Sequence, residues 1–243
     1  MKLSVCIPMY NEGKIIENNA RALSAYLRSN FPDSELIYID DGSTDGCGDL
    51  VRGLGLPNCR VIGYQPNRGK GCAVRTGMLA ASGDICLFTD ADLAYGTEVI
   101  GEAVKVFAAH PDADLVIGSR KLAGDGYAGY TAARKLASKI YLWLLQRLGG
   151  FRLSDSQTGF KCFTGKAAKQ IFSLCETDRF AFDFEALCYA TRLGMKIEEM
   201  PVRIPNHGES KIHLVGDSLR MFRDILKIRR RVNRKVKELR KNA

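Results

Sequence analysis

Short apolar segments recur through the first half of the chain, and turn residues follow each of them. They span residues 3–9, 36–39, 60–64, 85–89 and 115–117. The segments between them carry apolar residues at helical spacing, at residues 12–28, 45–54, 72–81 and 98–109. Strands that are apolar on both faces and alternate with helices indicate a parallel sheet covered on both sides. The pattern therefore predicts an α/β fold with a mostly parallel sheet over about residues 1–120.

The pattern changes after Arg120, where the regular alternation of strands and helices ends. A long basic helix is expected from about Val215 onward. The other elements expected here are a glycine-rich loop at 121–130, a helix at 131–148, a turn at 155–161, short helices at 166–174 and 184–193, and an edge strand at 196–204.

Polar motifs follow each predicted strand of the first half. The carboxyl ends of parallel strands meet at one edge of a sheet, and open α/β sheets bind their ligands there. Motifs that share this position describe a ligand crevice rather than scattered surface. They are Pro8-Met9-Tyr10-Asn11-Glu12, Asp40-Asp41-Gly42-Ser43-Thr44-Asp45, Asn67-Arg68-Gly69-Lys70-Gly71, Asp90-Ala91-Asp92 and Gly118-Ser119-Arg120.

Asp90 and Asp92 are the most informative pair among these motifs. In an extended backbone, residues two apart point to the same side, so both carboxylates can converge on one point. Paired carboxylates suit a hard divalent cation that bridges to the phosphates of a substrate. The pair therefore suggests chemistry on a nucleotide diphosphate. The alternative is that one aspartate caps the next helix while the other is solvated.

The remaining motifs also have structural interpretations when each is taken alone. The segment 40–45 is a good turn and helix N-cap. Gly69-Lys70-Gly71 can be a turn from strand to helix. As a dinucleotide-binding fingerprint it lacks the third glycine, because Val74 stands there, and it follows the third strand rather than the first.

In their joint order the motifs closely resemble a family 2 glycosyltransferase of the GT-A fold. That fold is a Rossmann-like, mostly parallel sheet with helices on both faces. Three motifs of the second half resemble the polyprenyl-phosphate glycosyltransferases, with the dolichyl-phosphate glucosyl- and mannosyltransferases as the nearest branch. They are Asp155-Ser156-Gln157-Thr158-Gly159-Phe160-Lys161, Phe182-Asp183-x-Glu185 and Glu209-Ser210-Lys211.

The resemblance covers about residues 3–230 and implies a division of the chain. A GT-A domain would occupy residues 1–213, with a nucleotide-binding half at 1–120 and an acceptor half at 121–213. A basic amphipathic helix would follow at 214–243.

The resemblance also implies roles for individual residues. Asp90 would face the ribose or the metal, Asp92 would ligate Mg²⁺ or Mn²⁺ on the diphosphate, and Arg120 and Lys211 would neutralise phosphate charge. Ala94 departs from the mannosyltransferase pattern, which often has a polar residue there, so the metal shell must use water or another residue. The residues implied in nucleotide-sugar binding are Pro8, Tyr10, Asn11, Glu12, Asp40, Asp41, Gly42, Ser43, Gly69, Lys70, Asp90, Ala91 and Gln157. Those implied in catalysis are Asp92, Asp183, Arg120 and Lys211.

The activity implied is inverting transfer of a hexose from a nucleotide sugar, of the UDP-glucose or GDP-mannose type, to a polyprenyl phosphate. The likeness around Gln157 and Asp183 favours glucose from UDP.

A lipid phosphate needs no general base, because its second pKa of about 6 leaves it mostly anionic near neutral pH. The alternative acceptor is a glycan or glycolipid hydroxyl in cell-envelope polysaccharide synthesis, for which Asp183 is the best candidate base. With a phosphate acceptor Asp183 would only orient a partner, and we favour that structural role. The alternative from another functional class is a protein without catalytic activity that only binds a sugar nucleotide or a membrane.

Composition agrees with an ordinary soluble globular protein, since 46% of the 243 residues are apolar and 26% are charged. The longest apolar run, at 140–145, is far shorter than the ~20 residues that span a bilayer. The chain begins with Met1-Lys2 and continues directly into a strand pattern, so we expect no signal peptide and a cytoplasmic protein. The eight cysteines lack a Cys-x-x-Cys motif and zinc spacing with histidine, so we expect reduced thiols in the core.

The positive charge is concentrated in the tail. The net charge is +9, and residues 218–243 alone hold 11 basic and 2 acidic residues. Such a helix suits the anionic cytoplasmic leaflet of a membrane, at ~1 kcal/mol per basic residue near the surface, so we expect a peripheral membrane protein. The alternative is that the helix docks on the domain and its arginine and lysine side chains only face solvent. Nucleic-acid binding also fits a basic helix, but it would leave the acidic motifs unexplained, so we expect none. The apolar stripe expected on this helix is Val215, Leu219, Phe222, Leu226, Val232, Val236 and Leu239.

Overall fold

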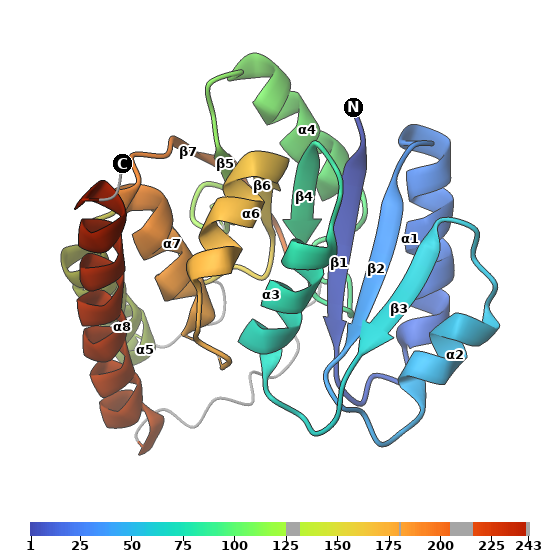
Figure 1. The fold of residues 1–243 in the computed structure, drawn as a ribbon, viewed down its shortest axis with the longest axis horizontal. Helices are drawn as coiled ribbons and strands as arrows, with labels where there is room; N and C mark the ends of the chain where they lie inside the picture. The colour runs from blue at the N-terminus through green and yellow to red at the C-terminus, as the bar shows by residue number, and fades with distance from the viewer. Residues whose placement is uncertain (125–131, 180, 205–215, 242–243) are drawn as a thin grey trace.

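The computed structural model describes residues 1–124, 132–179, 181–204 and 216–241 (Figure 1). Within this described part, a seven-stranded sheet has the order β3-β2-β1-β4-β6-β5-β7. The strands are β1 (Leu3–Met9), β2 (Glu35–Asp40), β3 (Cys59–Gly63), β4 (Ile85–Phe88), β5 (Leu115–Ser119), β6 (Lys161–Thr164) and β7 (Ile197–Pro201).

The strands predicted in the first half are confirmed, and they are parallel. β1 pairs in parallel with β2 and with β4, and β2 pairs in parallel with β3. Their carboxyl ends therefore meet at one edge of the sheet. The predicted edge strand is β7, which pairs in parallel with β5 at the border of the sheet.

The strand β6 is a correction to the sequence-based prediction, which placed a turn at 155–161 and then a helix. β6 lies between β4 and β5 and pairs antiparallel with both. It has only four residues and begins with the charged Lys161, so it carries almost no periodic signal. Its pairing with a strand more than 70 positions away makes it a strand, and local sequence does not encode that pairing.

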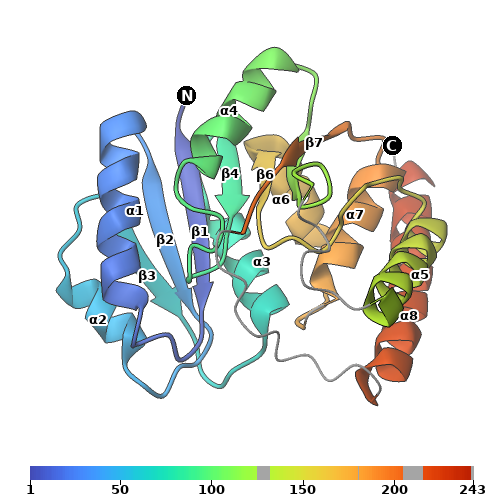
Figure 2. The same ribbon diagram turned by 180° about the vertical axis from the view of Figure 1, so that it is seen from behind.

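Helices cover both faces of the sheet, as the apolar strands predict. They are α1 (Ile16–Asn30), α2 (Cys47–Gly53), α3 (Lys70–Ala80), α4 (Val99–Ala109), α5 (Ala132–Gly149), α6 (Gly165–Leu174), α7 (Phe182–Arg192) and α8 (Gly216–Lys241). One core packs α3, α6 and α7 against the sheet face seen in Figure 1. The other packs α1, α2 and α4 against the face seen in Figure 2. The eight cysteines are free thiols, and all but the half-buried Cys59 are buried.

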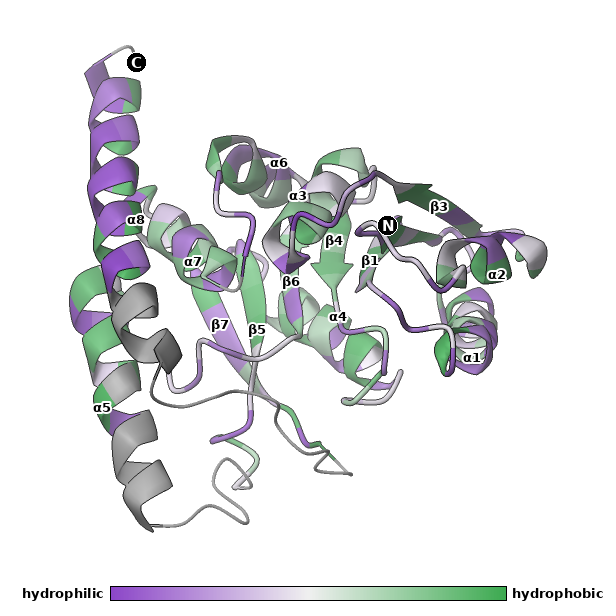
Figure 3. Ribbon diagram, turned by 90° about the horizontal axis from the view of Figure 1, so that it is seen from below, coloured by the Kyte–Doolittle hydropathy of each residue, from purple (hydrophilic) through white to green (hydrophobic). Residues whose placement is uncertain are grey.

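The predicted C-terminal helix is present as α8, which lies beside α5 and α7 at one end of the molecule (Figure 3). Its buried side chains are Ile225, Ile228, Val232 and Val236, which join the core around α7. The predicted stripe is therefore wrong in part, because Leu239 is 42% exposed and Leu226 only half-buried. Val215, the side chains of Leu219 and Phe222, and the predicted boundary at 213/214 lie outside the described residues. In the described part of the chain, no helix combines the length and the apolarity needed to cross a membrane.

Candidate active site

Asp90 follows β4 at the carboxyl edge of the sheet and forms an ion pair with Lys70, the first residue of α3. Burial alone would lower the pKa of Lys70, but the negative charges of Asp90 and Asp183 raise it above its ordinary value. Gly159 closes the other side of the pair. A Cβ atom on Gly159 would lie 2.7 Å from Cγ of Asp90, so only glycine leaves room for this carboxylate.

Asp92 is exposed beside this ion pair. Its Oδ1 accepts a hydrogen bond from the backbone N–H of Ala94 at 3.1 Å. The strand β4 ends at Phe88, and Leu93 donates its N–H to the carbonyl of Asp90, so the motif lies in a turn and the extended backbone expected for it is wrong. Within the residues that the structure describes, no three His, Cys, Asp or Glu side chains cluster as a complete metal site.

Asp41 is buried, and its carboxylate organises the loop after β3. It accepts hydrogen bonds from the backbone N–H groups of Arg68 at 3.0 Å and Gly69 at 2.8 Å, and from Nδ2 of Asn67 at 2.8 Å. Gly42 has a φ of 75° and lies against the same loop, since a Cβ atom there would be 2.5 Å from the backbone N of Asn67. The second motif therefore holds the third in place.

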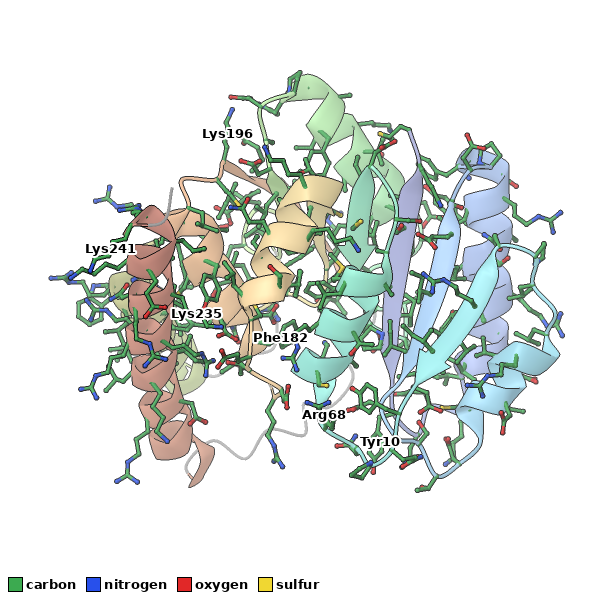
Figure 4. The ribbon with its side chains drawn as sticks, in the orientation of Figure 1. Tyr10, Arg68, Phe182, Lys196, Lys235 and Lys241 are labelled. Atoms are coloured by element: carbon green, nitrogen blue, oxygen red, sulfur yellow. The ribbon has the colours of Figure 1, made fainter. Side chains whose placement is uncertain are left out.

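The first and second motifs are joined in the same way. Asn11 has a φ of 57°, its N–H donates to Oγ of Ser43 at 3.1 Å, and its Oδ1 accepts from the N–H of Thr44 at 2.8 Å. Asp40 in turn accepts from the N–H of Ser43 at 2.8 Å. Tyr10 remains 46% exposed at the carboxyl edge, at the same end of the molecule as Arg68 (Figure 4).

Three other predicted residues, from the first and fourth motifs, are buried or half-buried. Pro8 is buried inside β1, Glu12 is half-buried, and Ala91 is buried. The carbonyl of Ala91 accepts a hydrogen bond from Nδ2 of Asn19 at 2.8 Å. Among the predicted residues of the first motif, Tyr10 is the one that exposes an aromatic ring at the carboxyl edge of the sheet.

Arg120 follows β5 and forms a bidentate ion pair with Asp155. Its Nε and Nη2 atoms donate to Oδ2 and Oδ1 of that carboxylate at 2.7 and 3.1 Å. Burial would raise the pKa of Asp155, but the Arg120 guanidinium outweighs it and lowers the pKa. The exposed Gln157 donates its backbone N–H to the same carboxylate at 3.1 Å. Arg120 and Gln157 therefore share a partner that motif matching alone did not assign.

Asp183 lies in the first turn of α7 and is buried against Lys161. The Nζ of Lys161 is 2.9 Å from Oδ1 of Asp183 and donates to the carbonyl of Thr158 at 2.7 Å. The two side chains therefore form a buried ion pair. Burial raises the pKa of Asp183, although Lys161 and Lys70 both act to lower it. No catalytic or binding role was predicted for Lys161, and the sequence signals this buried charge only by placing a lysine between Phe160 and Cys162.

The two glycines of the third motif lie beneath the segment 177–179. A Cβ atom on Gly69 would be 2.7 Å from the carbonyl oxygen of Asp178, and one on Gly71 would be 2.9 Å from that of Arg179. The N–H of Cys72 also donates to the carbonyl of Asp178 at 3.0 Å. These glycines let a distant segment approach the first turn of α3, which sequence spacing could not indicate. Lys211, with Glu209 and Ser210, lies outside the described residues.

Comparison with known proteins identifies relatives over nearly the whole chain. The model of the family described as glycosyl transferase family 2 matches residues 4–172. A dolichyl-phosphate beta-glucosyltransferase of Trichomonas vaginalis is 33% identical over 236 residues, which cover 93% of this chain and 72% of the relative. The enzyme of the same name from Saccharomyces cerevisiae is 33% identical over 248 residues, covering 93% and 74%.

A solved structure confirms the fold. Glucosyl-3-phosphoglycerate synthase from Mycobacterium tuberculosis, in complex with UDP, superposes with a TM-score of 0.70 at 22% identity. The match covers 96% of this chain and 80% of that one. The predicted GT-A fold is thus confirmed, and the family model and the relatives show that the protein is an enzyme. The chain belongs to glycosyl transferase family 2.

Proposed function

We propose that this glycosyltransferase transfers glucose from UDP-glucose to a polyprenyl phosphate, with inversion, at the cytoplasmic face of a membrane. The observation that carries the proposal is the charge arrangement after β4, where Lys70 is paired with Asp90 and Asp92 is exposed beside them. The names of the 33% identical relatives support glucose as the sugar and dolichyl phosphate as the acceptor class.

The reaction exchanges one bond for another at the anomeric carbon. A phosphate oxygen of the acceptor attacks from the face opposite the leaving group, and the bond from the anomeric carbon to the nucleoside diphosphate breaks. Negative charge then grows on the diphosphate, and cationic groups fixed beside it stabilise the transition state. Lys70 is the described cation at this position, and Asp90 orients its ammonium group.

The exposed carboxylate of Asp92 fits a divalent ion. Its Oδ1 accepts one backbone hydrogen bond, and Mg²⁺ typically needs only one or two carboxylates besides substrate phosphates and water. Asp92, with Asp90 beside it, would hold Mg²⁺ or Mn²⁺, and such an ion supplies further positive charge to the leaving diphosphate. The Mycobacterium tuberculosis synthase has been crystallised with Mn²⁺ and UDP-glucose, which supports this assignment.

The environment of Asp183 supports a phosphate acceptor over a hydroxyl. A hydroxyl must lose its proton during attack and needs a general base within hydrogen-bond reach. Asp183 is buried and paired with Lys161, and this pairing suits a positioning role. An anionic phosphate needs no base.

The surface proposed for membrane contact is the outer face of α5. Ile140 and Trp143 are 57% and 61% exposed there, and Arg147 and Arg152 are exposed nearby. The described apolar side chains Ile225, Ile228, Val232 and Val236 of α8 are buried, so that helix would contribute mainly its exposed cations. An aromatic ring flanked by cations suits the interface of an anionic bilayer. The variant Ile140→Ser/Trp143→Ser should sediment less with phosphatidylglycerol vesicles, and undiminished sedimentation would contradict this surface.

A donor screen tests the activity itself. Release of UDP or GDP would be measured from UDP-glucose and GDP-mannose, with MnCl₂, in the presence and absence of a polyprenyl phosphate. We expect acceptor-dependent release of UDP from UDP-glucose. Release from UDP-glucose that does not increase with the polyprenyl phosphate, or no release with either donor, would refute the proposal.

A further inference from the structure

Arg231 differs from most cations of α8 because its side chain turns inward. Its Nε and Nη2 atoms donate to Oε1 of Glu185 at 3.0 and 2.6 Å, and Nη2 also donates to Oγ1 of Thr177 at 2.7 Å. Arg234, one turn further on, has a side chain that is 72% exposed. The sequence alone groups Arg231 with the surface cations, but its side chain is only 24% exposed and its guanidinium contacts the buried Glu185.

Glu185 connects this arginine to the segment before α7. Its side chain is fully buried, and its second oxygen accepts from the N–H groups of Glu176 at 3.0 Å and Thr177 at 2.7 Å. A buried carboxylate requires a paired cation and satisfied hydrogen bonds. Arg231 supplies the cation, so the position of residues 176–177 depends on α8.

The same segment holds the first turn of α3. The carbonyl of Asp178 accepts from the N–H of Cys72 at 3.0 Å, and the carboxylate of Asp178 pairs with Arg75 in the next turn of α3. Gly69 allows this close approach. A continuous set of contacts therefore runs from α8 to the turn that carries Lys70.

We propose that Arg231 is a positioning residue for the donor site. Through Glu185 it fixes the segment 176–178, and this segment fixes the first turn of α3, which places Lys70 on Asp90. The C-terminal helix is then part of the catalytic unit. The inference rests on the proposed function in one respect, namely that Lys70 faces the diphosphate of the donor.

The test compares Arg231→Met with two neighbours on α8. Asn233→Ala removes a polar contact with Arg192 of α7, and Val232→Ala removes apolar packing, while neither side chain forms a hydrogen bond or an ion pair with residues 176–178. The first readout is amide hydrogen exchange of residues 71–76 without any ligand. The second is KM and kcat for UDP-glucose with MnCl₂ and a polyprenyl phosphate, well below the unfolding temperature.

We expect Arg231→Met to speed exchange in the first turn of α3 and to lower kcat/KM by about tenfold or more, since a displacement near 1 Å costs about 100-fold. Asn233→Ala and Val232→Ala should leave both readouts near wild type. Arg231→Lys, which keeps the charge, should restore part of the loss, and it replaces Arg231→Met if that variant does not fold.

Two outcomes would overturn the inference. One is unchanged exchange and unchanged kcat/KM in Arg231→Met, and the other is an equal effect of Val232→Ala, which would mean that any loosening of α8 suffices. Failure of the proposed function is a separate result. In that case the wild-type enzyme itself shows no turnover with UDP-glucose, while the exchange experiment still decides whether Arg231 holds α3.

Discussion

Gly159→Ala should disable the donor site while leaving the fold intact. The new Cβ would overlap Oδ2 of Asp90 and lie 2.7 Å from its Cγ, whereas an ordinary contact begins at 3.4 Å. The carboxylate must therefore retreat by about 0.7 Å or more, away from its place beside Lys70. Because a 1 Å misplacement costs about 100-fold in rate, we expect kcat/KM to fall by about 10- to 100-fold, or about 1.4–2.7 kcal/mol.

The assay is steady-state transfer from the nucleotide sugar, with the melting temperature measured in parallel. Gly53→Ala at the end of α2 is the matched control, because a Cβ atom there meets nothing within 4 Å. It should keep wild-type kcat/KM. Wild-type kcat/KM in Gly159→Ala would refute the placement of Asp90 in the reacting site, and so would a loss explained entirely by unfolding.

Three further changes test the site, the acid stability and the docked helix. Asp92→Ala should lower kcat by about 100-fold or more in saturating Mg²⁺, because it removes the proposed metal ligand, and unchanged turnover would refute that role. Although burial opposes it, hydrogen bonds from Ser4 and Ser82 lower the pKa of Glu35 from 4.5 to about 2. A lowered carboxyl pKa contributes stability that is full above pH 4.5 and is lost as pH falls toward 2, so urea unfolding of Glu35→Gln should depend less on pH in that window than wild type. Ile228→Ala should lower the unfolding free energy by about 2–5 kcal/mol, because the side chain is only 3% exposed, and a change below 1 kcal/mol would contradict its burial against α7.

The first half of the fold is predictable from the local pattern of apolar and polar residues. Each predicted strand there matches an observed strand within one or two residues, because an apolar run buried on both faces is its own signal. The polar motifs also lie at the carboxyl edge as predicted, since parallel strands bring the same end of each strand to one edge. Asp90 and Lys70 both lie at this predicted edge, and their ion pair is a contact that the structure adds.

The contacts between distant segments were not predictable in this way. The strand β6, the ion pair of Lys161 with Asp183 and the burial of Glu185 against Arg231 join residues 20 to 80 positions apart. Single-sequence periodicity reports only whether a residue faces the core, and not which partner meets it there. Glycine is likewise needed at 69 and 71 because the segment 177–179 lies against them, and at 159 because the carboxylate of Asp90 does. These partners are distant in the sequence.

By itself, the sequence determined the order of strands and helices, the edge at which the ligand crevice lies and the presence of a basic helix at the end of the chain. Only the tertiary structure decided which face of that helix is buried. Leu226 and Leu239 have the right spacing and the right polarity, yet Ile225 and Ile228 are the residues that pack on the core. The physical reason is that burial depends on the shape and charge of the surface opposite, and that surface includes the buried Glu185 of α7, which pairs with Arg231 of α8.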